Sequence, residues 1–298
     1  MSVIRKKIYK KNENEDISSD IMIKATTIFK NNNWNIEDDN IQWKERFNIY
    51  CDMLSKLTLE QQNFLLELTG KYLYINNSDY MAELNSLLTN LYKQNYANVK
   101  SYNKVYVMPL VAPRDINTVK SSTMLAYLFM MTELEYNPLL KNIQFIRCEN
   151  KQSIPKSINQ KSTSIIFLVD DFIGTGETAI EALDDLMKNN ISMNKILVIS
   201  LVAMKNGINT INKYGVNVFS NKIMKKGISD FYKGNELITK QEIMKSIENK
   251  LPINSVYNFG YKGSEALVTM TRTPNNTFPI FWYNNKKKGI DAPFPRRG

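Results

Sequence analysis

The chain has 298 residues, 43% of them hydrophobic, and carries a formal net charge of +10. It contains no histidine, which excludes triads with a histidine base, histidine-ligated metals and imidazole acid catalysis. Its two cysteines, Cys51 and Cys148, have no metal-binding or redox spacing, so we expect neither a disulfide framework nor a zinc site. Any chemistry must therefore use carboxylates, lysines, hydroxyls, backbone amides or a bound metal ion.

Hydropathy and net charge predict where the protein is located and which partners it could bind. No stretch approaches the roughly 18 to 20 consecutive apolar residues of a membrane span, and the basic residues 1–11 precede no apolar segment. We expect a soluble cytoplasmic protein without a membrane partner. The positive charge favours polyanionic partners. Because an AT-rich genome also produces a chain rich in Asn, Lys and Ile, nucleic-acid binding stays open.

The first third of the chain has helical periodicity. Residues 1–18 are charged and poor in apolar side chains, and we expect them to be loose. From residue 21 to 94, apolar residues recur at three- and four-residue steps, and Thr58 with Gln61 predicts a helix-capping box. We interpret residues 1–100 as a helical region whose apolar stripes form a core. A role for these helices in a toxin–antitoxin-like complex stays open.

Strands and helices alternate in residues 101–220, which predicts an α/β core with a parallel sheet. The run at 164–169 shows no alternation, as expected of a central strand covered on both faces. The expected strands are 105–111, 143–147, 164–169, 196–203 and 216–219, and the expected helices lie near 123–136, 178–188 and 208–214.

Residues 221–298 have a different pattern, and we interpret them as a smaller α+β cap with a basic tail at Lys286 to Lys288. The expected strands here are 255–259, 265–270 and 278–283. Asn275 and Asn276 follow Pro274 and are turn formers, although they could also belong to a hood over a ligand. The same alternatives, core packing or a hood, apply to Phe281, Trp282 and Tyr283.

Residues 165–178 carry the most chemical information: an apolar strand is followed by two acids, two apolar residues and a short Thr/Gly loop. This segment resembles the phosphoribosyl pyrophosphate signature of type I phosphoribosyltransferases. Glycines allow backbone amides to approach a phosphate, threonines add hydroxyl donors, and the next helix directs its positive end at the anion. The candidate phosphate- and ribose-binding residues are Asp170, Asp171, Gly174, Thr175, Gly176, Glu177 and Thr178. The carboxylate of Glu177 would repel a phosphate unless it points outward.

The resemblance implies further site residues and a ligand. Asp170 and Asp171 would fix the two ribose hydroxyls and are the possible metal ligands, and Lys120 would complete the catalytic set. The pyrophosphate loop would contain Arg114, Lys120, Ser121 and Ser122, although either serine could merely cap the following helix. Residues 148–163 would form a mobile lid over the pyrophosphate, and Arg147, Lys151, Lys156 or Lys161 could supply its cations. Mg²⁺ would bind together with phosphoribosyl pyrophosphate. Sheet-edge dimers are frequent in such proteins, so a homo-oligomer stays open.

A narrower resemblance extends from about residue 102 to the C-terminus. Its segments are 107–115, 120–122, 263–268, 273–282 and 292–296. They are similar to phosphoribosyltransferase-like effectors (PRTase-CE type) of prokaryotic conflict systems, including some retron antiphage loci. This implies an effector held inactive by a partner such as a reverse transcriptase with its RNA–DNA hybrid.

The sequence leaves two functions open. The first is an enzyme that transfers or cleaves at the anomeric carbon of a ribose, with an acceptor that the sequence does not identify. The second is a non-catalytic module that senses phosphoribosyl pyrophosphate or a nucleotide and binds a nucleic acid or a ribonucleoprotein.

Overall fold

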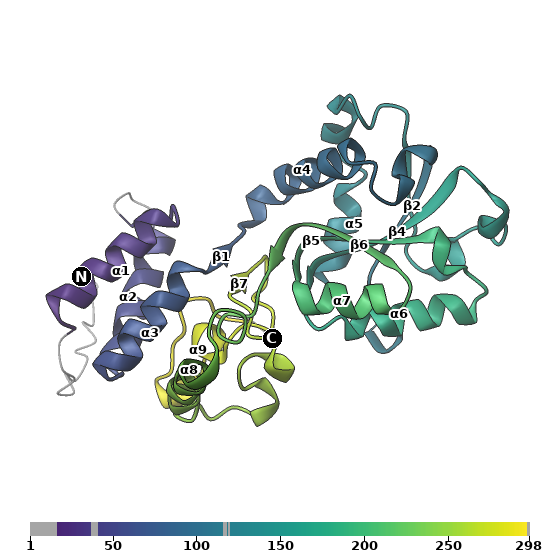
Figure 1. Cartoon of the computed structure of the whole chain (residues 1–298). Coiled ribbons are helices and arrows are strands. Elements are labelled where there is room, and N and C mark those ends of the chain that lie inside the picture. The colour runs from purple at the N-terminus through teal and green to yellow at the C-terminus, as the bar shows by residue number, and fades with distance from the viewer. Residues whose placement is uncertain (1–16, 37–40, 116–117, 119, 297–298) are drawn as a thin grey trace, which may run out of the picture.

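The computed structural model describes residues 17–36, 41–115, 118 and 120–296. The expected loose tail falls largely on residues 1–16, which lie outside the described residues, as do positions 116, 117 and 119 of the expected pyrophosphate loop. The chain forms two lobes, a sheet lobe and a second lobe that contains both ends of the described chain (Figure 1). Over the described ranges, no helix has the length and apolar character needed to cross a membrane.

The sheet lobe is built on five parallel strands in the order β3-β2-β4-β5-β6, which confirms the expected α/β class. The chain places β3 on one side of β2 and β4 on the other, so the direction of winding reverses between β2 and β4. Ligands of open α/β sheets bind outside the carboxyl ends of the strands at this point. The strands are β2 (Lys104–Pro109), β3 (Gln144–Arg147), β4 (Ser164–Ile173), β5 (Ile196–Met204) and β6 (Asn217–Met224).

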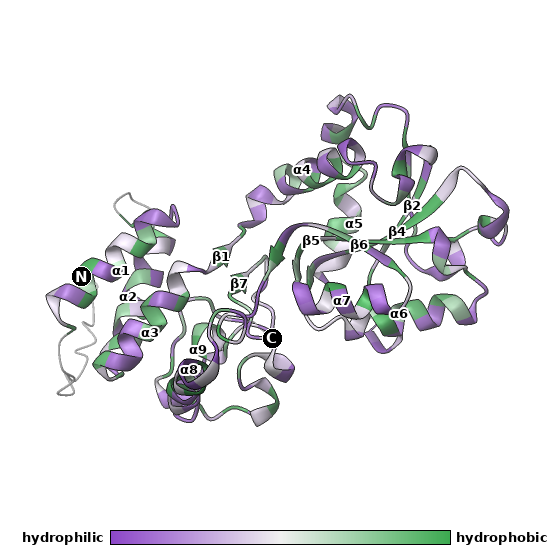
Figure 2. Cartoon of the chain, viewed as in Figure 1, coloured by the Kyte–Doolittle hydropathy of each residue, from purple (hydrophilic) through white to green (hydrophobic). Residues whose placement is uncertain are grey.

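Helices cover both faces of the sheet. Phe167 of β4 faces the cluster that contains Leu125 of α5, whereas Leu168 faces the cluster that contains Leu183 of α6. Burial on both sides explains why this strand lacks polar alternation, and β2 and β4 are hydrophobic along most of their length (Figure 2). One face carries α4 (Tyr80–Lys93) and α5 (Ser121–Leu128), and the other carries α6 (Glu177–Lys188) and α7 (Lys205–Lys213).

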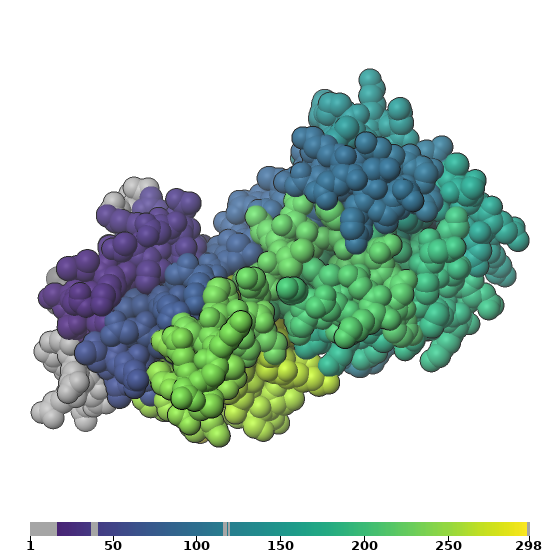
Figure 3. All heavy atoms as spheres, viewed as in Figure 1, coloured from purple at the N-terminus to yellow at the C-terminus, as the bar shows by residue number. Residues whose placement is uncertain are grey.

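The second lobe combines the two ends of the chain in one hydrophobic core. Phe294, near the C-terminus, stacks on Tyr72 with ring centroids 4.6 Å apart and also contacts Trp34. The apolar stripes of the N-terminal helices are therefore core, and the space-filling view shows these helices in contact with C-terminal segments (Figure 3). The helices are α1 (Ser19–Asn31), α2 (Ile41–Ser55), α3 (Leu59–Gly70), α8 (Gly234–Glu248) and α9 (Pro279–Trp282).

Two of the three strands expected in the C-terminal segment are wrong. Residues Ser255–Tyr257 form a 3-10 turn, which the side chain of Asn254 caps, and Pro279 begins the short helix α9. Proline is favoured at the first helical position, where its missing N–H is not needed. The third expected strand is reduced to β7 (Val268–Thr269).

A short parallel pairing joins the two lobes. β1 (Leu73–Tyr74) pairs with β7, and the adjacent residues Leu267 and Val268 belong to the cores of different lobes. α4 packs on the sheet although the sequence assigns it to the helical N-terminal region. The division at residues 100 and 220 stays a prediction, but the cores show that both terminal segments fold together.

Two acidic side chains are buried in the second lobe. Glu248 is 2% exposed and Glu265 is 3% exposed. Both oxygens of Glu248 accept from the N–H of Phe259, at 3.1 and 2.9 Å. Burial first, and the charge of Glu265 in addition, raises the pKa of Glu248 to about 8.

This burial predicts a pH dependence of stability. Because the pKa of Glu248 is higher in the folded state than its ordinary value of 4.5, the folded protein binds more protons than the unfolded chain between pH 4.5 and about 8, and stability falls as pH rises through this window. We expect Glu248→Gln to reduce that fall and to stabilise the protein by about 1 kcal/mol or more at pH 8.5. Urea unfolding between pH 5 and 8.5 measures it, with the exposed Glu242→Gln as the control on the same helix. A constant difference between Glu248→Gln and wild type at every pH would contradict this account.

Candidate ligand-binding site

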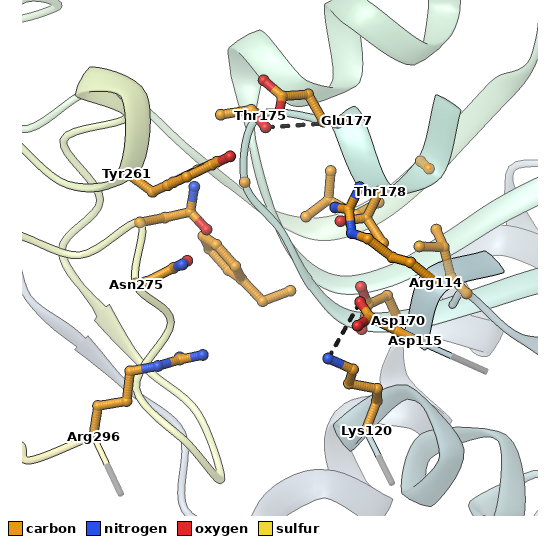
Figure 4. A pocket seen from close by; sticks show the side chains of 17 residues that line it. Arg114, Asp115, Lys120, Asp170, Thr175, Glu177, Thr178, Tyr261, Asn275 and Arg296 are labelled. Carbon is orange, nitrogen blue, oxygen red and sulfur yellow. Dashed lines mark hydrogen bonds and ion pairs between the residues drawn. The ribbon is translucent and has the colours of Figure 1, made fainter. Parts of the chain in front are cut away.

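A cleft lies between the carboxyl edge of the sheet and the second lobe. It consists of two adjoining cavities of about 320 Å³ and about 430 Å³. The residues that line both cavities are Leu110, Asp115, Lys120, Asp170, Phe172, Thr178, Asn275, Asn276 and Arg296. The cleft is therefore at the reversal point of the sheet, where the fold predicts a ligand (Figure 4).

The loop between β4 and α6 is held by close backbone contacts. A Cβ atom on Gly174 would lie 2.3 Å from Nδ2 of Asn276, and a Cβ atom on Gly207 would lie 2.3 Å from the carbonyl oxygen of Gly174. Gly176 has a φ of +87°, which favours glycine. The loop thus fits between α7 and the second lobe. The amides of Thr178 and Ala179 in the first turn of α6 have no intrahelical acceptors and point where an anion could bind.

The threonine hydroxyls and the glutamate carboxylate of this loop have different partners. Thr175 and Thr178 line the cleft, and Oγ1 of Thr175 accepts from the N–H of Glu177 at 3.4 Å. Both carboxylate oxygens of Glu177 accept from Nζ of Lys262 at 2.8 Å. The charge of Glu177 is therefore compensated by the second lobe, which relieves the repulsion that the sequence suggests.

The two consecutive aspartates have different surroundings. Asp171 is 4% exposed, and its carboxylate accepts from the hydroxyls of Tyr80, at 2.8 Å, and Ser121, at 2.6 Å. Asp170 is half-buried and lines both cavities. Burial and the neighbouring charge of Asp171 raise the pKa of Asp170 well above its ordinary value. Asp170 is thus the carboxylate open to a ligand, and Asp171 joins protein groups.

The expected pyrophosphate loop reaches the cleft with part of its residues. Nζ of Lys120 lies 3.3 Å from a carboxylate oxygen of Asp115, and both side chains line the cleft. Arg114 is paired with Glu181 of α6 at 2.6 Å. Ser122 is 1% exposed, and its hydroxyl has no hydrogen-bond partner within the described ranges. Lys120 is the cation of this loop that faces the cleft most directly.

The four cations of the expected lid do not line the cleft. Nζ of Lys151 pairs with Asp185 at 2.7 Å, and Arg147 lies over the ring of Tyr127. Lys151 and Arg147 line a separate cavity of about 410 Å³. Lys156 and Lys161 are not among the residues that line either cavity of the cleft.

The hood residues expected from the sequence fall into two groups. Asn275 and Asn276 line the cleft. The aromatic residues do not line the cleft. Phe281 is fully buried in the core of the second lobe, and Nε1 of the buried Trp282 donates to the carbonyl oxygen of Thr277 at 2.7 Å. Tyr283 is half-buried, and its hydroxyl donates to the carbonyl oxygen of Pro252.

Sequence reasoning missed four residues of the site, which are Tyr80, Tyr261, Arg272 and Arg296. Tyr80 begins α4 far from any motif, Tyr261 begins a three-residue 3-10 turn, and Arg272 lies in the loop that follows β7. Arg296 stands in the C-terminal Pro-Phe-Pro-Arg segment, where an arginine after two prolines was the available signal.

The parallel sheet, the paired aspartates after its central strand and the Gly/Thr loop at the start of α6 define a phosphoribosyltransferase-like α/β protein. The sequence profile of the PRTase-CE family matches residues 42–296, and the chain belongs to this family. The match begins in α2. It therefore includes N-terminal helices, whereas the resemblance found in the sequence begins only near residue 102.

The solved structures that are similar to the chain include the following two. Orotate phosphoribosyltransferase from Aeropyrum pernix has 15% identity and a TM-score of 0.29, with 60% of this chain and 78% of that chain covered. A hypothetical protein from Neisseria gonorrhoeae with bound ppGpp has 12% identity and a TM-score of 0.33, with coverages of 59% and 97%. Among curated proteins, none matches the chain.

The close approach at Gly174 gives a test of the loop. We expect Gly174→Ala to destabilise the protein by about 1–3 kcal/mol, because the new Cβ must displace the side chain of Asn276. Asn276→Ala in the same chain should restore part of this loss, and the four proteins of the double-mutant cycle are compared by urea unfolding. Gly70→Ala is the matched control, since no heavy atom lies within 4 Å of its Cβ position. Unchanged stability of Gly174→Ala would show that the loop does not need this contact.

Proposed function

We propose that this protein binds phosphoribosyl pyrophosphate, or a nucleotide through its 5′-phosphate, and transfers or cleaves at the anomeric carbon of the ribose. The observation that carries the proposal is the presence in one cleft of a Gly/Thr loop at a helix start, a half-buried carboxylate and a lysine. These are the loop 174–178, Asp170 and Lys120. A single ligand that has a phosphate at one end, a diol in the middle and a second anion beyond it fits this order.

The side chains favour one orientation of such a ligand. Thr175 lies at one end of the cleft and Lys120 at the other, with Asp170 on the sheet wall (Figure 4). The 5′-phosphate would bind the amides and hydroxyls of the loop, and the ribose hydroxyls would donate to Asp170. The pyrophosphate would then extend towards Lys120, Ser121 and Ser122, where the buried hydroxyl of Ser122 has hydrogen-bonding capacity left.

The proposed reaction needs charge stabilisation more than acid–base catalysis. The bond between the anomeric carbon and the pyrophosphate oxygen breaks, and its electron pair leaves with pyrophosphate. A lone pair of the acceptor forms the new bond; with water as the simplest acceptor, the products are ribose 5-phosphate, pyrophosphate and a proton. The protein's part is to position the sugar and to stabilise the leaving charge, which requires no histidine.

The residues present are compatible with Mg²⁺. The described residues contain no cluster of three or more Asp, Glu, Cys or His side chains that could hold a metal. Mg²⁺ is commonly bound by one or two carboxylates together with substrate phosphates and water, so Asp170 alone could serve as its protein ligand. Asp171 is less suited, because both of its oxygens already accept hydrogen bonds. When bound, Mg²⁺ would neutralise pyrophosphate charge.

We further propose that the activity serves antiphage defence and that a partner such as a reverse transcriptase with its RNA–DNA hybrid holds the chain inactive. Membership of the PRTase-CE family supports this proposal, and the net charge of +10 is compatible with a polyanionic partner. Copurification with such a partner that is lost at high salt would support it, and plaque counts with and without the intact site would test the defence role.

Calorimetry with ribose 5-phosphate, and with phosphoribosyl pyrophosphate plus Mg²⁺, tests the binding site. We expect Asp170→Asn to weaken both ligands by about 10- to 100-fold, because charge-assisted hydrogen bonds to the ribose are lost. Asp291→Asn, an exposed change in the second lobe, is the control and should bind as wild type does.

Pyrophosphate release measured on the same samples separates the two candidate functions. Release by wild type, with water or with an added base, nucleotide or nucleic acid as acceptor, identifies an enzyme, whereas tight binding without release with every one of these acceptors favours the sensing module. Equal affinity of wild type and Asp170→Asn would contradict the assignment of the ribose site.

A further inference from the structure

The wall of the cleft formed by the second lobe contains two arginines. Arg272 and Arg296 line the larger cavity, together with Lys120, Ser121 and Ser122 of the opposite wall. In the close-up view, the side chains of Arg296 and Lys120 point into the cleft from opposite sides, at the end remote from Thr175 (Figure 4).

These two arginines carry uncompensated charge. Across the described part of the chain, neither Arg272 nor Arg296 forms an ion pair with a carboxylate. They are close enough for their charges to interact: burial, and then the charge of Arg272, lowers the pKa of Arg296 to about 10. Arg296 is half-buried, whereas Arg272 is exposed at the mouth of the cavity. Two guanidinium groups that repel one another are stabilised by an anion bound between them.

Hydrogen bonds hold the side chain of Arg296 and the backbone next to Arg272 in position. Nη1 of Arg296 donates to the carbonyl oxygen of Thr273 at 2.5 Å. The N–H of Thr271 donates to the hydroxyl of Tyr80 at 2.9 Å, and that hydroxyl donates to Asp171. The segment 271–273 is therefore fixed to the sheet edge, and Arg272 is placed opposite the residues that follow β2 and β4.

We propose that Arg272 and Arg296 bind the pyrophosphate group of phosphoribosyl pyrophosphate from the second lobe and stabilise its negative charge as it leaves. This inference rests on the proposed function. The arginines would take the place that the lid cations hold in the family resemblance, since Lys151 is paired with Asp185 and does not line the cleft.

The charge of the opposite wall favours pyrophosphate over an anionic acceptor as the group bound here. The sheet wall offers Lys120, whose charge is shared with Asp115, next to the carboxylate of Asp170. Arg114 is compensated by Glu181. The side chains of the sheet wall therefore supply little net positive charge, and the two arginines would add positive charge at the same end of the cleft to that of the bound Mg²⁺.

Calorimetry with three separate probes tests this inference: inorganic pyrophosphate with Mg²⁺, ribose 5-phosphate, and phosphoribosyl pyrophosphate with Mg²⁺. We expect Arg272→Gln combined with Arg296→Gln to weaken pyrophosphate and phosphoribosyl pyrophosphate by about 10- to 100-fold and to leave ribose 5-phosphate unchanged. Lys286→Gln combined with Lys287→Gln removes two exposed cations from the same lobe and should change none of the three affinities. Because Arg296 also bonds Thr273, the single change Arg272→Gln gives the same reading if the double variant unfolds.

The outcomes separate this inference from the proposed function. If the arginine variants bound pyrophosphate as tightly as wild type does, the inference would be overturned. Binding of ribose 5-phosphate by the same proteins would still support the proposed function. An equal loss for all three probes would also overturn it, since the arginines would then act on the whole cleft. If wild type bound pyrophosphate through the arginines but bound neither sugar phosphate, the proposed function would fail and the pyrophosphate subsite would stand.

Discussion

The buried carboxylate of Asp171 is the interaction on which the geometry of the cleft depends. It accepts hydrogen bonds from Tyr80 at the start of α4 and from Ser121 at the start of α5, and Tyr80 in turn accepts the N–H of Thr271 from the second lobe. Burial and the charge of Asp171 raise the pKa of the Tyr80 phenol, so it stays a donor. Removal of either hydroxyl would leave a buried charge short of a partner, which is far more unfavourable than the loss of an exposed hydrogen bond.

Asp170 and Asp171 are adjacent residues of β4 with different roles. Asp171 is buried at the edge of the larger cavity and uses both oxygens to bind Tyr80 and Ser121, whereas Asp170 lines both cavities and remains open to a ligand. Two further contacts bring the second lobe onto the anion-binding loop: Asn276 packs against Gly174, and Lys262 pairs with Glu177. The cleft therefore exists only when both lobes are in place: the sheet wall supplies carboxylates and Lys120, and the second lobe supplies Arg272 and Arg296.

The hydropathy pattern predicted the strands and helices of the sheet lobe well, because the residues within each element determine its structure. The run at 164–169 is apolar without alternation, and β4 is buried on both faces, as such a run requires. The C-terminal segment was predicted poorly because its apolar residues fill a core shared with α1 to α3 rather than a sheet. Residues 278–283 have strand composition, yet Pro279 and the packing of Phe281 against Tyr72 make them helical.

The sequence by itself determined the parallel α/β class, the order of strand, acids, Gly/Thr loop and helix, and the candidate residues from Asp170 to Thr178. Tertiary structure alone decided which aspartate is occupied by protein hydroxyls, that Glu177 is compensated by Lys262, and that Tyr80, Arg272 and Arg296 complete the site. The physical reason is that strand and loop geometry depend on neighbours along the chain, whereas hydrogen bonds and charge compensation join residues more than 80 positions apart.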